Sequence, residues 1–433
     1  MRRTGGVRQA HRCILGNTVA LDATHGYDSP MREIFRPGRM WRRRGELRDS
    51  YDVVIIGGGA HGLSTAYHLG QLGVRSVAVL EQGYIGSGAA GRNTTILRSN
   101  YKTPEGARFY DASIRMYERL SVELDFNVLF SQCGHLTLAH SDRAMLVMAN
   151  RAEVNRLHGI DSRLVDTAEV KRLCPPINVS EDATYPIIGA LYHPPGGIIR
   201  HDAVVWGYAR GADRAGVEIH PGTEVQGLDV SRGRVTAVRT NRGTIRAGQV
   251  ISATAGWSTL VSAMAGVELP FTTHILQACV TEPVKPLLDV VVVSSQMHVY
   301  ISQSDRGEFV MGSEIEPWTT YRMQGTLNFL QDLTRHTLEL FPQLEHARVL
   351  RSWAGLCDLS PDYSPILGRT SVENFHVSAG WGTYGFKAAP IVGQTLAELV
   401  HTGRTPGLIA PFALERFYED RLVSELAAAA VSH

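Results

Sequence analysis

Lysine is scarce in this sequence, and acidic residues are as common as basic ones. Only four of the 433 residues are lysine, so arginine carries nearly all of the positive charge of 43 basic residues. Because 42 acidic residues reduce the net charge to +1, the sequence lacks the basic surplus of a dedicated nucleic-acid binder. We therefore expect no nucleic-acid partner, and we expect a lysine inside a motif, such as Lys387, to have a function.

Cysteines and long apolar runs are also few. The five cysteines are odd in number, lie far apart and show no metal-ligand spacing, which predicts no metal site and is typical of the reducing cytoplasm. No run reaches the about 18 apolar residues of a membrane helix, and the run 290–293 has the length of a strand. We expect a cytoplasmic protein without a membrane span.

Residues 1–50 form a basic segment. Eleven arginines against five acidic residues give it a surplus of six positive charges in a nearly neutral chain. Its apolar part is interrupted by Gly16 and Asn17 and lacks a small-residue cleavage site, which disfavours a secretory signal. We expect a basic N-terminal arm outside the core, which either docks a partner or reflects a start codon placed too early, with Met31 as the alternative start.

From Tyr51 the pattern alternates between strand and helix. The apolar run 53–56 ends in glycines, the helix pattern 63–72 follows, and a second strand at 76–80 leads to Glu81. An acidic residue at this position accepts hydrogen bonds from a ribose diol. These elements predict a βαβ unit that binds a dinucleotide, with Glu81 and the adjacent Gln82 at the ribose.

The glycines between the strand and the helix fit a pyrophosphate. Gly57 permits the tight turn, Gly59 lets the backbone approach the phosphates, and Gly62 lets the helix pack closely on the sheet. The helix that begins near Ala60, with His61 in its first turn, offers unpaired backbone amides and a positive dipole end.

Three more polar segments favour FAD over NAD, because a flavin spans a long cleft and is commonly held from several parts of a chain. The first segment is GSGAAGRNTTILR (86–98), the second is SATAGW (252–257), and the third is GWGTYGFK (380–387). The cofactor-binding residues that we expect in them are Arg92, Asn93, Thr94, Thr95, Ala255, Gly256, Gly382, Gly385, Phe386 and Lys387.

The remaining patterns mix both element types. Helix patterns occupy 107–124, 144–158, 202–215 with Asp202 as the cap, 325–340, and 388–402 with Pro390 in the first turn. Strand patterns occupy 135–138, 217–219, 225–238, 249–254, 272–312 and 375–378. They predict an α/β fold in which a discontinuous Rossmann-like FAD-binding domain is joined to an α+β substrate domain built on a mixed antiparallel sheet. We assign 50–105, 200–265 and 345–415 to the first domain, 106–199 and 266–344 to the second, and 416–433 to a C-terminal tail, whose last residues from Ala427 onward we expect to be mobile or covered by a partner.

These motifs resemble the D-amino-acid-oxidase-like flavoprotein superfamily and, more narrowly, the beta subunits of heterotetrameric sarcosine oxidases, from about Tyr51 onward. The most specific stretches are GRNTTILRSNY (91–101), GGIIRHDAVVWG (196–207), HILQACVTEPVKP (274–286), YISQSDRGE (300–308), PDYSPILG (361–368) and GWGTYGFKAAP (380–390). The resemblance implies a catalytic flavoprotein subunit with non-covalent FAD that demethylates sarcosine oxidatively to glycine. It also implies that electrons pass from FAD to FMN and then to oxygen, which gives hydrogen peroxide.

The same resemblance implies further groups and partners. His201 matches the histidine that carries covalent FMN at the interface with an alpha subunit. In that family the alpha subunit holds NAD and a tetrahydrofolate site that receives the one-carbon unit. Small gamma and delta subunits complete the assembly in that family. Arg98 and Lys387 match the residues that bind the substrate carboxylate, and charge-assisted bonds suit a small amino acid with little apolar area.

Two residues have alternative interpretations. His274 either lies near the flavin and tunes substrate protonation, or is a strand histidine satisfied by a backbone carbonyl. Cys357 is interpreted as structural, because aligning the segment SPILG places Gly355, rather than Cys357, where monomeric relatives attach FAD.

Two other functions stay open. One is a related amine or imino-acid dehydrogenase subunit that acts on dimethylglycine, proline or N-methylglutamate, since Tyr384 stands where a small residue is expected in the family. The other is a non-catalytic electron-relay or scaffold subunit. Such a subunit would keep the glycines and Glu81 but has no need of Arg98 together with Lys387.

Overall fold

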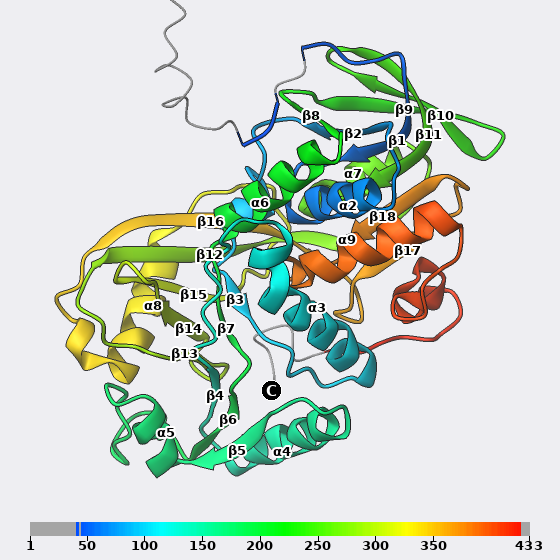
Figure 1. Ribbon diagram of the computed structural model, residues 1–433. Coiled ribbons are helices and arrows are strands. Elements are labelled where there is room, and N and C mark those ends of the chain that lie inside the picture. The colour runs from blue at the N-terminus through cyan, green and yellow to red at the C-terminus, as the bar shows by residue number, and fades with distance from the viewer. Residues whose placement is uncertain (1–39, 43–44, 426–433) are drawn as a thin grey trace, which may run out of the picture. The chain divides into compact units, whose positions relative to one another are not determined.

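The structure is a computed structural model that describes residues 40–42 and 45–425. Most of the predicted N-terminal arm, including Cys13 and Met31, and residues 426–433 of the predicted tail lie outside the described residues. The described residues form two eight-stranded sheets and a two-stranded sheet that pairs β3 (Ile96–Leu97) with β7 (Gly197–Ile198) (Figure 1).

The first sheet has a parallel centre, in the order β18-β11-β1-β2-β8, with β17 antiparallel at one edge and the hairpin β9-β10 attached to β11. Its strands are β1 (Ser50–Ile56), β2 (Val77–Glu81), β8 (Glu218–Pro221), β9 (Val225–Ser231), β10 (Arg234–Thr240), β11 (Gly243–Ser252), β17 (Ile366–Arg369) and β18 (Phe375–Ala379). The predicted βαβ unit is confirmed, since β1 and β2 are parallel neighbours joined by a helix.

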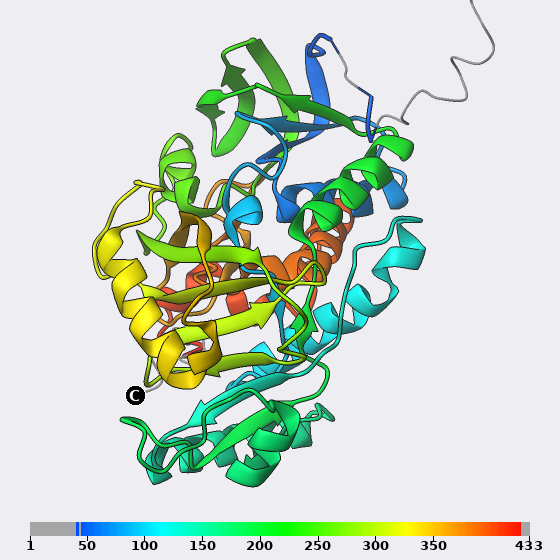
Figure 2. The same cartoon turned by 90° about the vertical axis from the view of Figure 1, so that its left-hand side faces the viewer.

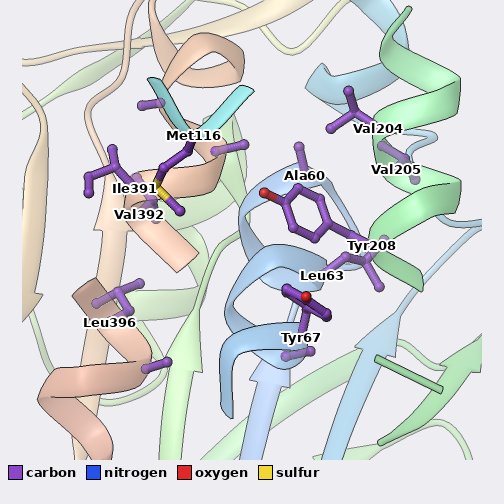
Figure 3. Packing of buried hydrophobic residues seen from close by; sticks show 14 of the residues in the cluster. Ala60, Leu63, Tyr67, Met116, Val204, Val205, Tyr208, Ile391, Val392 and Leu396 are labelled. Carbon is purple, nitrogen blue, oxygen red and sulfur yellow. The ribbon is translucent and has the colours of Figure 1, made fainter. Parts of the chain in front are cut away.

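The apolar run of β1 is buried on both faces, as parallel strands require. Val53 and Ile55 pack in one cluster with helices, whereas Val54 and Ile56 pack in another on the opposite face. On the first face α2 lies between α6 and α9, with α3 beside α9 (Figure 3). These helices are α2 (Ala60–Gln71), α3 (Pro104–Glu123), α6 (His201–Arg214) and α9 (Gly385–Thr402), and the short α7 (Ser258–Ala263) contributes to the second cluster.

The second sheet has the order β16-β12-β15-β14-β13-β4-β6-β5 and is antiparallel except at β13-β4. Its strands are β4 (His135–Ala139), β5 (Arg163–Asp166), β6 (Gly189–His193), β12 (Thr272–Pro283), β13 (Val291–Ser294), β14 (Val299–Gln303), β15 (Glu308–Ile315) and β16 (Val349–Leu359). Helix α8 (Leu327–Leu340) lies against this sheet (Figure 2). Its Phe329 and Leu333 belong to the same apolar cluster as the strands. The predicted α/β fold with a second, mixed sheet is confirmed.

The remaining described helices are short or peripheral. They are α4 (Asp142–Leu157), α5 (Thr167–Leu173) and the 3₁₀ turns η1 (Ala89–Arg92), η2 (Ala255–Trp257), η3 (Pro342–Leu344), η4 (Ala410–Phe412) and η5 (Leu414–Phe417). None of the helices within the described ranges is long and apolar enough to cross a membrane.

Two helix starts differ from the sequence prediction. Helix α6 begins at His201 after Arg200, so Asp202 lies inside the first turn, where it accepts a hydrogen bond from the Ala203 amide (2.9 Å) instead of capping the helix. Helix α9 begins at Gly385, which places Pro390 in the second turn. Proline has no amide proton for the carbonyl four residues earlier, and the hydroxyl of Tyr117 donates to that carbonyl, of Phe386, at 2.6 Å.

The predicted domain ranges stay a prediction. Strand β16 falls within 345–415, a range assigned to the FAD-binding domain, yet it pairs along its length with β12 of the second sheet. The sequence patterns include no strand at 349–359, and a local pattern carries no information about a partner strand so far away along the chain.

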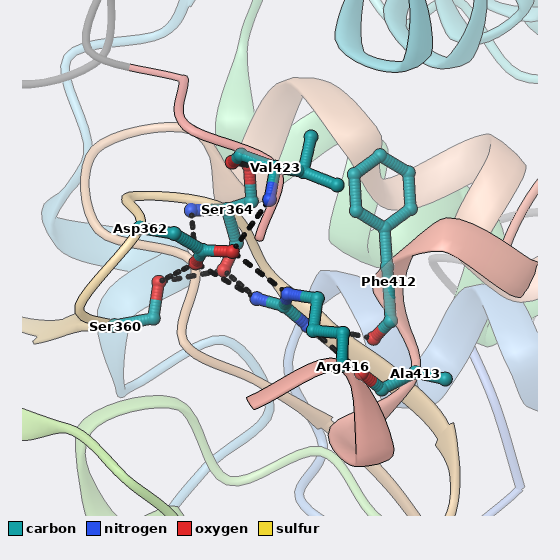
Figure 4. A network of polar contacts seen from close by, with 7 residues as sticks. All are labelled: Ser360, Asp362, Ser364, Phe412, Ala413, Arg416 and Val423. Atoms are coloured by element: carbon teal, nitrogen blue, oxygen red, sulfur yellow. Dashed lines mark hydrogen bonds and ion pairs between the residues drawn. The ribbon is translucent and has the colours of Figure 1, made fainter. Parts of the chain in front are cut away.

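The described part of the predicted C-terminal tail, residues 416–425, is anchored. Arg416 is 2% exposed and forms a two-pronged ion pair with Asp362, at 2.8 and 2.9 Å (Figure 4). The Val423 amide donates to the same carboxylate at 3.0 Å. Buried charges therefore fix residues 416–425 to the loop after β16, whereas the segment from Ala427 that is expected to be mobile or partner-covered lies outside the described residues.

Candidate active site

The carboxyl ends of the parallel strands meet at one edge of the first sheet. Ile56 at the end of β1 lies opposite Leu80 of β2 and Ser252 of β11. Ligands of open α/β sheets bind at this edge. The loops that follow these strands line a cavity of about 840 Å³ that extends to the second sheet.

The glycine turn after β1 has two kinds of glycine. Gly57 has a φ of 109°, and a Cβ there would lie 2.4 Å from the Ala253 carbonyl oxygen. A Cβ at Gly62 would lie 1.9 Å from the Gly57 carbonyl oxygen. At Gly59, which lines the cavity, a Cβ would meet only the Ala90 methyl group at 4.0 Å. Gly57 and Gly62 are therefore needed by the backbone itself, whereas Gly59 leaves space for a ligand.

The N-terminus of α2 faces this space. No side chain caps the helix at Gly59, so its first amides are left for a ligand. Burial lowers the pKa of His61 to about 4, so its ring is neutral. Its Nε2 donates to the Gly385 carbonyl (2.6 Å), and its Nδ1 accepts from the Ser378 hydroxyl (2.9 Å). His61 thus ties the start of α2 to the start of α9.

Glu81 ends β2 at the same edge. Its carboxylate accepts hydrogen bonds from the amides of Gly58 (2.9 Å) and Gly83 (2.8 Å), and Gln82 also lines the cavity. These two bonds fix the carboxylate where a ribose diol can reach it.

Two residues in the predicted cofactor segments have left-handed backbone conformations. Thr95 has a φ of 64° and Ala255 a φ of 48°, and both line the cavity. Such strain is uncommon for residues with a Cβ and gathers at ligand sites. The Thr95 amide is held by the Asn93 side chain at 2.7 Å, and Trp353 of β16 holds the Arg92 carbonyl at 2.8 Å.

These features fit FAD. An open Gly59, an uncapped helix and a fixed acidic residue suit the pyrophosphate and ribose, and the loops 87–98 and 253–257 with the turn 378–387 continue the same lining toward the second sheet.

At the other end of the cavity three cations converge. Arg98 follows β3, Lys387 lies in the first turn of α9, and Arg151 comes from α4. Lys387 is 8% exposed, which rules out a surface lysine. Burial, and then the charge of Arg98, holds the pKa of Lys387 well below its usual value.

Arg98 and Arg151 share one partner. Arg98 donates to the carbonyl and side-chain oxygens of Asn100 at 3.2 and 3.1 Å, and Arg151 donates to the same two oxygens. Burial, followed by the charge of Arg98, lowers the pKa of Arg151 to about 9. His135 of β4 lines this end too, and burial keeps its pKa well below the usual value, so it adds no charge.

Sequence reasoning missed Arg151, Asn100, His135 and Asp358. One signal for Arg151 was available, since Met148, Arg151 and Asn155 form the buried face of α4 at the spacing normally filled by apolar side chains. Asp358 at the end of β16 accepts from the Gly380 amide at 2.6 Å, and burial raises its pKa to about 6.

Four predicted residues do not line the cavity. Gly62 and Gly256 serve backbone packing, since a Cβ at Gly256 would lie 2.6 Å from the Leu356 side chain. The Nδ1 of His274 donates to the Glu316 carbonyl and its Nε2 accepts from the Thr272 hydroxyl, both at 2.9 Å, which are the contacts of the strand-histidine alternative. We therefore drop the catalytic role of His274.

His201, the fourth, begins α6 beside the cofactor loop. The Ile199 amide donates to the Thr95 carbonyl at 3.1 Å, and a Cβ at Gly86 would come 3.2 Å from Val205 of α6. His201 therefore lies two residues beyond a direct contact with the cavity lining.

Cys357 and Tyr384 also have defined places. Cys357 lines the cavity, and burial raises the pKa of its thiol, which keeps the thiol protonated and weakly nucleophilic. Tyr384 caps α9 and packs against Tyr101 and Tyr110 at 5.4 and 5.9 Å between ring centroids, outside the lining of the 840 Å³ cavity.

Comparison with known families agrees with this geometry. Residues 52–399 match the family model described as DAO, FAD dependent oxidoreductase. This chain belongs to the DAO family. As a member it is an FAD-dependent oxidoreductase, so the prediction of FAD as its cofactor is confirmed.

Within the DAO family the chain is similar to sarcosine oxidase subunit beta. It is 44% identical to that subunit from Arthrobacter sp over 389 residues, which cover 90% of this chain and 96% of the relative. The subunit from Rhodobacter capsulatus is 43% identical over 90% of this chain and 94% of its own. Mitochondrial dimethylglycine dehydrogenase of Rattus norvegicus is 26% identical over 83% of this chain, but only 44% of that protein is covered.

Among solved structures, L-proline dehydrogenase from P. horikoshii matches with a TM-score of 0.82 and 29% identity, over 87% of this chain and all of that one. Glycine oxidase from Geobacillus kaustophilus, at 23% identity and a TM-score of 0.78, shares the fold.

Proposed function

We propose that this chain is the catalytic flavoprotein subunit of a sarcosine oxidase, which demethylates sarcosine oxidatively to glycine. The observation that carries the proposal is that partly buried Arg98 and buried Lys387 line one end of a cavity whose other end fits FAD. The identity of 43–44% with subunit beta from three bacteria supports sarcosine as the amine. An electron-relay or scaffold subunit has no use for buried cations at this place.

Arg98 and Lys387, here named the carboxylate clamp, would bind the substrate carboxylate through charge-assisted hydrogen bonds. When bound, FAD supplies the two-electron oxidation of the amine carbon. Loss of hydride requires a neutral amine, and the positive charges of Arg98, Arg151 and Lys387 lower the pKa of a bound ammonium group because like charges disfavour its protonated form. His135 is neutral and adds no charge at this end of the cavity.

We also propose that His201 carries a covalent FMN and that alpha, gamma and delta subunits complete a cytoplasmic assembly. NAD and the tetrahydrofolate site would belong to the alpha subunit. Burial lowers the pKa of His201, so the ring is neutral and has a nucleophilic nitrogen. Its position beside the Thr95 contact supports a second flavin close to the first.

The clamp is tested by replacing Lys387 with methionine, with Lys285→Met as the control, because Lys285 is an exposed lysine of the same chain. We expect Lys387→Met to retain FAD absorbance while kcat/KM for sarcosine falls by about 100-fold or more, the loss of a buried charged contact. Lys285→Met should have the same FAD absorbance and the same kcat/KM for sarcosine as the unsubstituted protein. Unchanged turnover in Lys387→Met with FAD bound would show that the clamp is assigned wrongly.

The two-flavin proposal is tested on protein co-expressed with its operon neighbours. After acid precipitation we expect free FAD in the supernatant and a flavin mononucleotide adduct on the His201 peptide by mass analysis. An unmodified peptide, with the alpha subunit present, would point instead to a single-flavin amine oxidase or dehydrogenase.

The dehydrogenase alternative keeps the same clamp but another amine or electron acceptor. Oxygen uptake and dye reduction, each measured with sarcosine, dimethylglycine, L-proline and N-methylglutamate, separate the two. Fast oxygen uptake with sarcosine alone supports the oxidase, and dye reduction without oxygen uptake supports the dehydrogenase.

A further inference from the structure

Glu425 lies buried between the two segments that carry the carboxylate clamp. It is 2% exposed, and its amide donates to the Asp362 carbonyl at 3.0 Å. Two residues earlier Val423 donates to the Asp362 carboxylate, which also holds Arg416 (Figure 4). The backbone that presents Glu425 is therefore fixed by a buried ion pair.

On one side Glu425 binds the segment that follows Arg98. Its carboxylate accepts hydrogen bonds from the amides of Lys102 (3.1 Å) and Thr103 (2.9 Å) and from the Thr103 hydroxyl (2.7 Å). Thr103 is the N-cap of α3, so the carboxylate also meets the positive end of that helix. Between these contacts and Arg98 lie only Ser99, Asn100 and Tyr101, and the Arg98 guanidinium lies 4.5 Å from the Tyr101 ring centroid.

On the other side Glu425 binds the segment that precedes Lys387. The Tyr384 hydroxyl donates to the Glu425 carbonyl at 3.0 Å. Lys387 lies one helical turn later, with its Nζ 5.6 Å from the Tyr384 ring centroid. The rings of Tyr101 and Tyr384 meet edge to face at 5.4 Å. Glu425 thus joins two segments that are far apart along the chain, 98–103, which begins with Arg98, and 384–387, which ends with Lys387.

We propose that Glu425 is a positioning residue of the amine-oxidising site, which holds the segments of Arg98 and Lys387 at the separation that one small carboxylate requires. This inference rests on the proposed clamp. Glu425 itself does not line the cavity, so it acts through its partners and not on the substrate. Its negative charge also opposes the repulsion between Arg98 and Arg151, because it favours the charged form of Arg151.

The test uses the complete protein with FAD bound and the substitution Glu425→Gln, which keeps the size of the side chain. The control is Glu419→Gln, because Glu419 lies in the same segment but is half exposed and pairs with exposed Arg421. We measure kcat and KM for sarcosine, and the dissociation constant of propionate from the change in flavin absorbance. Propionate offers a carboxylate without an oxidisable amine, so its binding reports the clamp without turnover.

We expect Glu425→Gln to raise the KM for sarcosine and the dissociation constant of propionate by the same factor, about tenfold, the usual loss of a charge-assisted contact. kcat, FAD content and melting temperature should stay close to those of Glu419→Gln. Thr103→Val and Tyr384→Phe each remove one bond at opposite ends of the bridge, and each should weaken propionate binding by about threefold.

Two outcomes would overturn the proposal. One is unchanged propionate binding in Glu425→Gln, and the other is a parallel loss of FAD, melting temperature and kcat, which describes a residue that only supports the fold. If Glu425→Gln does not fold, Thr103→Val and Tyr384→Phe test the proposal instead, through the same measurements of propionate binding, kcat, FAD content and melting temperature. Failure of the clamp itself is separate, because Lys387→Met would then bind propionate as the unsubstituted protein does.

Discussion

Replacing each of two glycines of the same turn, Gly59 and Gly62, with alanine should affect different properties: FAD affinity in the first case and stability of the fold in the second. Gly59 has φ and ψ of −84° and −172°, which alanine adopts readily, and a methyl group there would stand in the open cavity. The loss of a good N-cap residue and the smaller entropy of the unfolded chain oppose each other, so the apoprotein should change in stability by less than about 1 kcal/mol. The methyl group would, however, occupy the space that the pyrophosphate needs.

The affinity for FAD should therefore fall while the fold persists. Two charge-assisted hydrogen bonds from the α2 amides are worth about 3 kcal/mol together, which corresponds to a loss of about a hundredfold. Gly62→Ala places a methyl group 1.9 Å from the Gly57 carbonyl oxygen, and backbone on both sides blocks relaxation. We expect it to destabilise the apoprotein by about 3 kcal/mol or more.

The assay titrates each apoprotein with FAD by quenching of flavin fluorescence and melts it without FAD by circular dichroism. Gly407→Ala is the control, because a Cβ there meets nothing within 4 Å. If Gly59→Ala binds FAD as tightly as the control, the pyrophosphate does not cross Gly59 and the reasoning fails. If the Gly62→Ala apoprotein melts like the control, the close approach of α2 to β1 is not required.

Two further predictions follow from buried charges. Arg416→Met leaves the Asp362 carboxylate buried without its partner and should lower the free energy of unfolding by about 3–5 kcal/mol, measured by heat or urea. Arg421→Met breaks only the exposed pair with Glu419 and should lower it by less than about 1 kcal/mol. Equal losses of stability in the two variants would contradict the buried pair. Because Lys387 has a pKa held well below its usual value, propionate should bind tightly at pH values below that pKa, where the ammonium is charged, and progressively more weakly above it. Lys387→Met should abolish this dependence in flavin-absorbance titrations, and a pH profile unchanged by the substitution would assign the titration to another group.

The βαβ unit was predictable because its signals are local. The run 53–56, the three glycines and Glu81 lie within 30 residues, and each has a backbone or packing reason that holds in many proteins. Lys387 could be singled out for a similar reason, since it stands in a glycine-rich turn in a chain with four lysines.

Residues whose role depends on distant partners were not predictable. Arg151 and Glu425 belong to a helix and a terminal segment with ordinary local patterns, and they reach the site only because α4 and residues 416–425 pack beside the stretch 98–103. His274 illustrates the same limit, since its sequence context left both a role near the flavin and a strand histidine open, and only its contacts with the Glu316 carbonyl and Thr272 hydroxyl favour the second. The pairing of β16 with β12 was not predictable for the same reason, because a partner so far away along the chain leaves no local trace.

The cavity lining has a consequence for how this protein is made. Its first residue is Ile56 and its last is Lys387, so the ribosome must complete α9 before the cavity exists. At about 5–20 residues per second, that interval lasts on the order of twenty seconds to a minute. During this interval β1 lacks its parallel neighbour β11, and β11 in turn lacks β18, because these neighbours are synthesised later. The complete cavity is therefore available to FAD only after Lys387 has been made, and a larger supply of the cofactor then raises, by mass action, the fraction of chains that are folded.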